Sequence, residues 1–73
     1  MNNKKPILQV CIIHGGAKAY WLTADDKPMG RKRYSHPDCE IYFKGSRNHH
    51  VDHTVMIALQ SANMSAGALV YVG

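Results

Sequence analysis

A chain of 73 residues makes a single domain and is too short to enclose a deep substrate cavity beside a separate supporting core. Hydrophobic residues make up 45% of it and charged residues 19%, which argues against a wholly disordered chain, and no apolar stretch approaches the ~20 residues of a membrane span. The formal net charge of +4 favours an anionic partner: a nucleic acid, an acidic protein surface or an anionic membrane.

The basic residues are confined to one part of the chain. All nine lie between Lys4 and Arg47, which leaves residues 48–73 with a single acid, Asp52, and no base. This asymmetry predicts one surface that meets a negatively charged partner and a second part that packs or docks elsewhere.

Strands are expected in the first part of the chain. The first is a short run rich in β-branched residues, bounded by Pro6 and by Gly15-Gly16, which suit a tight turn. A second run is centred on Tyr20, and a dense turn signal of Asp, Pro and Gly separates it from the third. Pro37 ends the third run, because proline cannot donate to a strand ladder. The expected strands are residues 7–13, 17–24, 31–35 and 39–43.

A helix is expected in the second part of the chain. From Val51 onward, apolar residues recur at three- and four-residue spacing, as one face of a helix requires. Asp52 is the expected N-cap, and Gly67 is well placed to end the helix. Residues 68–73 stay open between a last strand, a docked tail and a disordered end, and residues 1–5 are expected to be flexible.

The expected fold is a single α+β domain over residues 1–73, a small antiparallel β-meander of three to four strands packed by one C-terminal helix. A domain of this size is marginally stable and often relies on a disulfide, a metal or a partner. The two cysteines, Cys11 and Cys39, do not make a disulfide framework. No good secretory signal is recognised, so reduced thiols in a cytoplasm are expected.

The first candidate for a binding surface is the basic stretch Arg31-Lys32-Arg33, followed by Tyr34. In a meander it would lie across a hairpin from the second strand, which carries a lysine and two aromatic residues. Cations that track phosphates beside rings that stack bases are typical of single-strand nucleic-acid binders. The alternative is a solvated hairpin rim, whose charges protect an edge strand while the aromatic side chains lie in the core.

A zinc site is the second candidate. His36 and Cys39 are followed by histidines at ligand-like spacing, and a metal would stabilise a small domain. Zinc sites usually begin with a close cysteine pair, which this chain lacks. The alternative is therefore a buried cysteine with a solvated histidine cluster, and no cofactor is expected. The candidate ligands are His36, Cys39, His50 and His53.

No catalytic site is expected. Cys39 and His36 could act as nucleophile and base, but no third residue is placed to orient them, and a lone cysteine in an apolar run is more often part of a core. The glycine pair lacks the further Gly, Lys and Ser/Thr of a phosphate-binding loop. The sequence therefore predicts a binding protein rather than an enzyme.

Two stretches of the chain, together with its length, carry a resemblance to a known family. They are KKPILQV and AYWLTADDKPMGRKRYSHPDCEIYF. Over most of residues 1–62 the chain resembles the small RNA polymerase-binding regulators of lytic Xanthomonas bacteriophages. The resemblance implies a protein of the host bacterial cytoplasm that shuts down host initiation and acts as an antiterminator.

The resemblance also implies how such a protein acts. It would bind the largest subunit of the bacterial RNA polymerase near that subunit's N-terminus, beside the RNA exit channel, and weaken σ engagement at promoters. On the elongating enzyme it would narrow the exit channel, cooperate with a host Nus factor and prevent the terminator hairpin from forming, close to the nascent RNA.

No family motif assigns contact residues, so physical chemistry selects them: cations near emerging RNA and an apolar surface for protein docking. The alternatives are a free-standing single-stranded RNA- or DNA-binding domain, with or without zinc, and an inhibitor of another protein such as a nuclease. No membrane contact is expected. The expected partner-binding residues are Lys4, Lys5, Trp21, Arg31, Lys32, Arg33, Tyr34, Lys44 and Arg47.

Overall fold

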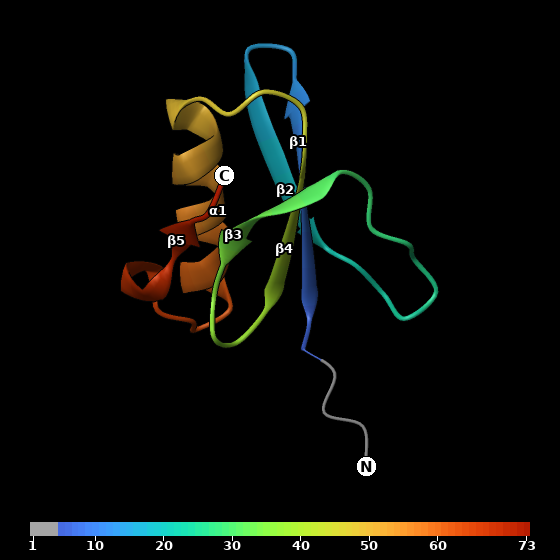
Figure 1. Cartoon of the computed structure of the whole chain (residues 1–73), viewed down its shortest axis with the longest axis vertical. Helices are drawn as coiled ribbons and strands as arrows, with labels where there is room; N and C mark the ends of the chain where they lie inside the picture. Colours follow the sequence, from blue (N-terminus) through green and yellow to red (C-terminus); the bar gives the residue numbers. More distant parts are fainter. Residues whose placement is uncertain (1–4) are drawn as a thin grey trace.

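The computed structural model describes residues 5–73, so Lys4, one of the expected partner-binding residues, lies outside the described part. The structure confirms a small α+β domain with one α-helix over a sheet (Figure 1). In chain order the elements are β1 (Ile7–Ile13), β2 (Gly16–Trp21), β3 (Arg31–Ser35), β4 (Glu40–Lys44), α1 (His49–Ser61), the 3-10 turn η1 (Ala66–Ala68) and β5 (Val70–Tyr71).

The sheet is mixed, with the strand order β2-β1-β4-β3-β5. Two antiparallel hairpins, β1–β2 and β3–β4, lie side by side because β1 and β4 pair in parallel at the centre. The predicted antiparallel meander of three to four strands is corrected in both respects, since the sheet has five strands and one parallel pair. The physical reason is burial: β1 and β4 carry the large apolar side chains Leu8, Val10, Ile41 and Phe43, and the centre of the sheet removes all four from water.

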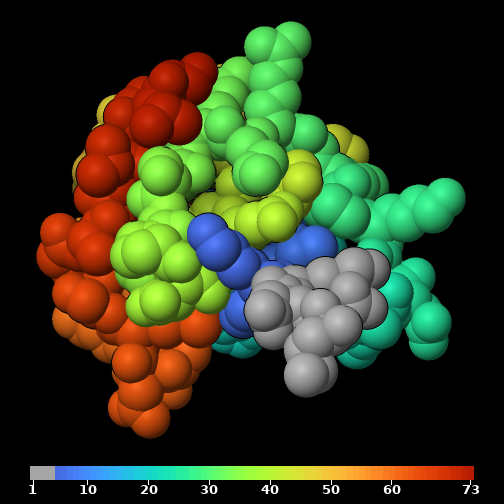
Figure 2. All heavy atoms as spheres, turned by 60° about the horizontal axis from the view of Figure 1, so that its bottom comes forward, coloured from blue at the N-terminus to red at the C-terminus, as the bar shows by residue number. Residues whose placement is uncertain are grey.

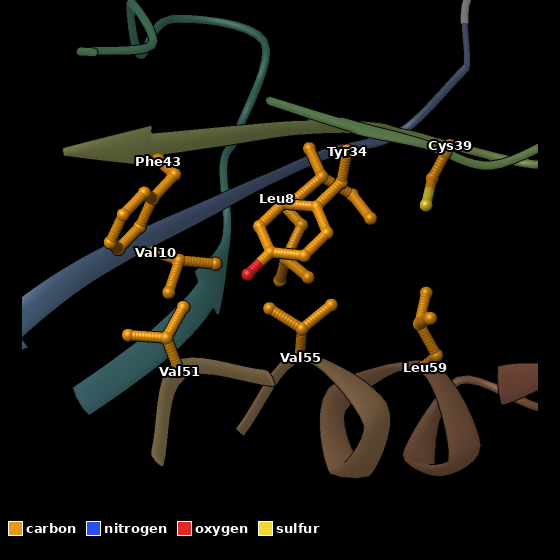
Figure 3. Packing of buried hydrophobic residues seen from close by; sticks show 9 residues of the cluster. Leu8, Val10, Tyr34, Cys39, Phe43, Val51, Val55 and Leu59 are labelled. Carbon is orange, nitrogen blue, oxygen red and sulfur yellow. The ribbon is translucent and has the colours of Figure 1, made fainter. Parts of the chain in front are cut away.

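Helix α1 covers one face of this sheet, and the core lies between them. Three helix residues one turn apart, Val51, Val55 and Leu59, point at the strands and are fully buried (Figure 3). Burying a side chain of this kind stabilises the fold by about 1.5–3 kcal/mol. The strand and loop residues that complete the core are Leu8, Val10, Tyr34, Cys39, Ile41 and Phe43.

Both ends of α1 differ from the prediction. Asn48 caps the start, because its side-chain oxygen accepts a hydrogen bond from the Val51 amide at 3.1 Å, whereas Asp52 lies inside the first turn. The helix ends at Ser61 rather than near Gly67. Asn63 takes the left-handed conformation there, and the amide of Met64 donates back to the Leu59 carbonyl at 2.8 Å. Asparagine tolerates that conformation well enough to end the helix before the glycine is reached.

The connection between β2 and β3 leaves the sheet on the side opposite α1 (Figure 1). The turn signal of residues 25–30 lies within this connection, which the strand order requires to cross from one side of the β1–β4 pair to the other. The buried side chain of Gln9 fastens this connection to the sheet. The Met29 amide donates a hydrogen bond to the Gln9 side-chain oxygen at 2.7 Å. Gly30 then passes against the backbone of Phe43.

The C-terminal residues form a short strand, which is one of the three outcomes left open for residues 68–73. β5 pairs with the outer edge of β3, with Tyr71 opposite Tyr34 and Val70 opposite Ser35. The Val72 amide adds a hydrogen bond of 2.7 Å to the Arg33 carbonyl. The end of the chain is therefore tied to the sheet, although its side chains stay exposed.

Gly30 is predicted to be the least replaceable of the turn glycines. Its φ of +89° is in the left-handed region, and a Cβ placed there would collide with the Phe43 carbonyl. Gly15 has a similar φ of +76° but no atom within 4 Å of an added Cβ, which makes it the matched control. We expect Gly15→Ala to lower the free energy of unfolding by about 1–2 kcal/mol and Gly30→Ala to lower it by clearly more. Urea denaturation measures both, and equal losses would contradict the close approach.

Candidate functional site

The alternation of side chains along the strands divides the molecule into two surfaces. Leu8 and Val10 of β1 point at α1, so the residues between and after them, Gln9 and Cys11, point away from the helix. The strand register extends this side across the sheet, because residues paired across neighbouring strands share a face. We call this surface the lysine–tyrosine face; its members are Lys18 and Tyr20 of β2, Tyr42 and Lys44 of β4, and Lys32 of β3.

The residues of this face form two rows. Cys11 pairs with Lys18 on one side and with Lys44 on the other, so the two lysines flank a small, half-buried side chain. Gln9 pairs in the same way with Tyr20 and Tyr42. Each row spans two strand spacings, about 10 Å, and the rows are about 7 Å apart along the strands.

Part of the positive charge on this face is not balanced by an ion pair with an acidic side chain. Glu40 is the one acidic strand residue on this side in the described chain, and it forms an ion pair of 3.7 Å with Lys32. The Lys32 ammonium also lies 5.9 Å from the centre of the Tyr42 ring. Within residues 5–73, Lys18 and Lys44 make no ion pair, so their charges are open to an anionic partner.

The basic stretch of β3 does not lie next to the second strand, as the predicted meander required. Two strands separate β3 from β2, so Arg31, Lys32 and Arg33 are not across a hairpin from the lysine and aromatic residues of β2. An irregularity in the ladder also disturbs the alternation between Arg31 and Tyr34. Arg31 pairs with Phe43, a core residue, while Arg33 is half-buried with its guanidinium carbon 5.9 Å from the Phe43 ring.

Arg47 and Tyr34 belong to a polar cluster that fastens the C-terminal strand. Arg47 donates to both carboxylate oxygens of Asp52, at 3.0 and 2.8 Å, and its guanidinium lies 3.7 Å from the centre of the Tyr71 ring. The buried Tyr34 donates its hydroxyl to the same carboxylate at 2.6 Å. Both predicted contact residues are thus engaged within the domain, and Tyr34 is out of reach of a partner in this conformation.

The cluster shifts the ionisation of its members. The hydrogen bonds from Arg47 hold the pKa of Asp52 below its usual value, and the Tyr34 hydroxyl acts in the same direction. Burial raises the pKa of Tyr34, and the hydrogen bond to Asp52 raises it further. The carboxylate is therefore charged and the phenol neutral at neutral pH.

A second surface, which we call the helix side, combines exposed apolar side chains with polar ones and is hollowed on both flanks of α1. On one flank of α1, a shallow hollow of about 320 Å³ is lined by Trp21, Ala19 and Ile57, and on the other flank a hollow of about 280 Å³ is lined by Met56 and Tyr71. Met56 and Ile57 are 40% and 48% exposed. Trp21, predicted to contact a partner, reaches this side, where it packs partly against the core.

The structure does not bring the four candidate zinc ligands together. His36 uses both ring nitrogens, since Nδ1 accepts from the Asp38 amide at 3.1 Å and Nε2 lies 2.8 Å from the Ser65 carbonyl. Cys39 is in the core, where burial raises the pKa of its thiol, while His50 and His53 are exposed on α1. Within residues 5–73, no three His, Cys, Asp or Glu side chains are close enough to hold a metal.

Lys5 lies at the end of the molecule where β1 begins. It lines a hollow of about 540 Å³ together with Lys32, Ser35 and residues of the turn after β3. Figure 2 views this end, where the first described residues lie against the segment that carries His36 and Cys39. The hollow is open to solvent and combines lysines with Glu40, so it does not single out one ligand.

Comparison with protein-family models, curated proteins and solved structures finds no match to this chain. No helix in residues 5–73 is long and apolar enough to cross a membrane. The residues that sequence reasoning left out, Tyr42 and Ile57, carried no local signal, because their exposure depends on strand order and helix packing.

The Asp52 cluster predicts a pH-dependent stability. Because the pKa of Asp52 is lower in the folded chain, its contribution is complete above the unfolded pKa of about 3.9 and is lost as the pH falls through the folded-state value. We expect Asp52→Asn to lower the free energy of unfolding by about 1 kcal/mol at neutral pH and to flatten its decline on acidification.

Tyr34→Phe is the matched variant for this test. It removes one hydrogen bond to Asp52 but keeps the pair with Arg47, so it should cost about 1 kcal/mol and leave most of the acid dependence in place. Urea denaturation at neutral and acidic pH measures both. A wild-type pH profile in Asp52→Asn would show that the cluster does not contribute to stability.

Proposed function

We propose that this chain is a non-enzymatic transcription regulator of a lytic Xanthomonas bacteriophage. It binds the host RNA polymerase through the largest subunit, near the RNA exit channel, where it inhibits σ-dependent initiation and promotes antitermination together with a host Nus factor. It works in the cytoplasm of the host bacterium. The resemblance of KKPILQV and of the AYWL to EIYF stretch to such regulators supports this proposal.

The observation that carries the proposal is the separation of two surfaces on one small domain. The helix side presents the exposed apolar side chains of Met56 and Ile57, each beside a shallow hollow, which suits docking on a protein. The opposite side presents Lys18 and Lys44, which make no ion pair within residues 5–73, and this suits an environment of emerging RNA. A protein held at an exit channel needs both kinds of surface at once.

Such a role needs no covalent chemistry. A bound domain changes the outcome by occupying space and by binding one state of the polymerase better than another. Preference for the enzyme without σ inhibits initiation, and preference for a narrowed exit channel opposes hairpin formation. The difference in binding free energy between polymerase states is then sufficient to explain the effect on transcription.

The structure changes which residues we expect at the polymerase. Trp21 keeps its expected role, because it lines the hollow beside Ile57. Tyr34 and Arg47 become supports of the C-terminal strand instead of direct contacts. Met56 and Ile57 join as the central docking residues.

The proposed docking surface is tested by removing its exposed apolar side chains. We expect Met56→Gln/Ile57→Gln to weaken binding to purified Xanthomonas RNA polymerase at least about tenfold, since buried apolar anchors at interfaces typically contribute more than 1 kcal/mol each. Glutamine retains helix propensity, so α1 should persist. Binding is measured by surface plasmon resonance after nuclease treatment, and read-through of an intrinsic terminator reports activity.

The chain offers a closely matched control. Ile12 and Ile13 at the hairpin end of β1 are 40% and 49% exposed, nearly the same as Met56 and Ile57. Ile12→Gln/Ile13→Gln should bind polymerase as the wild type does. If wild-type protein does not bind polymerase, the proposal fails. A loss confined to the hairpin variant would move the docking surface away from the helix side.

A further inference from the structure

The two tyrosines of the lysine–tyrosine face are placed as a base-stacking surface. Tyr20 is 38% exposed and Tyr42 is half-buried, and both rings project from the same side of the sheet on either side of Gln9. The face of a tyrosine ring stacks on any base, because every base presents a π-face. Two such rings about 10 Å apart are within reach of one flexible strand.

The lysines next to them supply the charge that a phosphate backbone requires. Lys18 and Lys44 lie one row beyond the tyrosines toward the turn between β1 and β2, and neither makes an ion pair within the described chain. Lys32, on the neighbouring strand β3, lies beside the ring of Tyr42. Cations beside aromatic rings that reach the surface of a sheet are an arrangement with which single strands are held without base readout.

We propose that the lysine–tyrosine face binds single-stranded nucleic acid, with Tyr20 and Tyr42 stacked on bases and Lys18 and Lys44 against phosphates. The inference rests on the proposed function for its source of ligand, since at the polymerase the strand would be nascent RNA. Binding does not depend on sequence, because ring faces and lysines do not distinguish base edges. It also differs from the site first expected in β3, where Arg31 lies opposite a core residue.

The connection between β2 and β3 favours a single strand over a duplex. It stands out from this side of the sheet (Figure 1), and Gln9 fixes it between the two tyrosines. A rigid double helix laid on the lysines would meet this segment. A single strand is flexible enough to bend around this segment, so that its bases stack on Tyr20 and Tyr42 while its phosphates lie along Lys18 and Lys44.

The test uses the purified full chain and labelled nucleic acids, without polymerase. A fluorescein-labelled single-stranded RNA of about 12 nucleotides, a DNA strand of the same sequence and the corresponding RNA duplex are compared by fluorescence anisotropy. We expect both single strands to bind at least about fivefold more tightly than the duplex, since stacking needs unpaired bases. Equal or tighter duplex binding would overturn the proposal.

The variants separate stacking from charge. Tyr20→Ala should weaken RNA binding at least about fivefold, whereas Tyr20→Phe keeps the ring and should bind as the wild type does. Lys18→Gln/Lys44→Gln should reduce the slope of log affinity against log salt by about 1.4, the value for two phosphate contacts on a single strand. Unchanged affinity in Tyr20→Ala, or an unchanged slope in the lysine variant, would overturn the proposal.

Arg31→Gln is the control for nonspecific attraction. It removes one charge from β3, and its effect on affinity should stay below about twofold. If Arg31→Gln lost more RNA affinity than Lys18→Gln/Lys44→Gln, the phosphate contacts would lie on β3 rather than on the lysine–tyrosine face, and the proposal would be overturned. Thermal melting of each variant shows that it is folded, and the polymerase-binding assay, run in parallel, shows whether a failure concerns this face or the proposed function.

Discussion

β1 and β4 run side by side in parallel at the centre of the sheet, and the other elements take their positions from that pairing. The pairing sets the apolar residues of both strands beneath α1, where Leu8, Val10, Ile41 and Phe43 meet the buried stripe of the helix. It also forces the segment after β2 to cross the opposite side of the sheet. In a domain of this size, one central pair of apolar strands supplies much of the buried surface, so the rest of the fold cannot form without it.

The same pairing creates the surface to which we assign nucleic-acid binding. Strand alternation sends the apolar half of β1 and β4 to the helix and the other half outward, and the register then aligns Lys18 with Lys44 and Tyr20 with Tyr42 across β1. A slip of one residue in either ladder would turn these side chains into the core. The face is thus a consequence of how the core forms, and it requires no separate structural device.

Charge in this protein has more than one role. Arg47 is basic by composition, yet in the fold its guanidinium is engaged by Asp52 and Tyr71 and serves to hold β5. Lys32 is partly compensated by Glu40, whereas Lys18 and Lys44 make no ion pair in the described residues. The basic stretch of β3 stands out in the sequence, but within residues 5–73 Lys18 of β2 and Lys44 of β4 are also without an ion pair, and the fold places them on one face with two tyrosines.

The amino-acid sequence by itself determined the local structure. The β-branched run before Gly15, the turn residues around Pro28 and the apolar spacing from Val51 predicted four strands and one helix close to their observed positions, because propensity and periodicity act over a few residues. Asn48 and Asn63 displaced the expected helix ends, since several residues in each region could serve as caps.

Only the tertiary structure decided which strands are neighbours, which side of the sheet stays open and which cations remain unpaired. Those features depend on contacts between residues far apart in the chain, such as Gln9 with Met29 and Tyr34 with Asp52, which leave no periodic signal. The parallel pair at the centre is favoured by the apolar area it buries, a property of the whole sheet that no single segment contains.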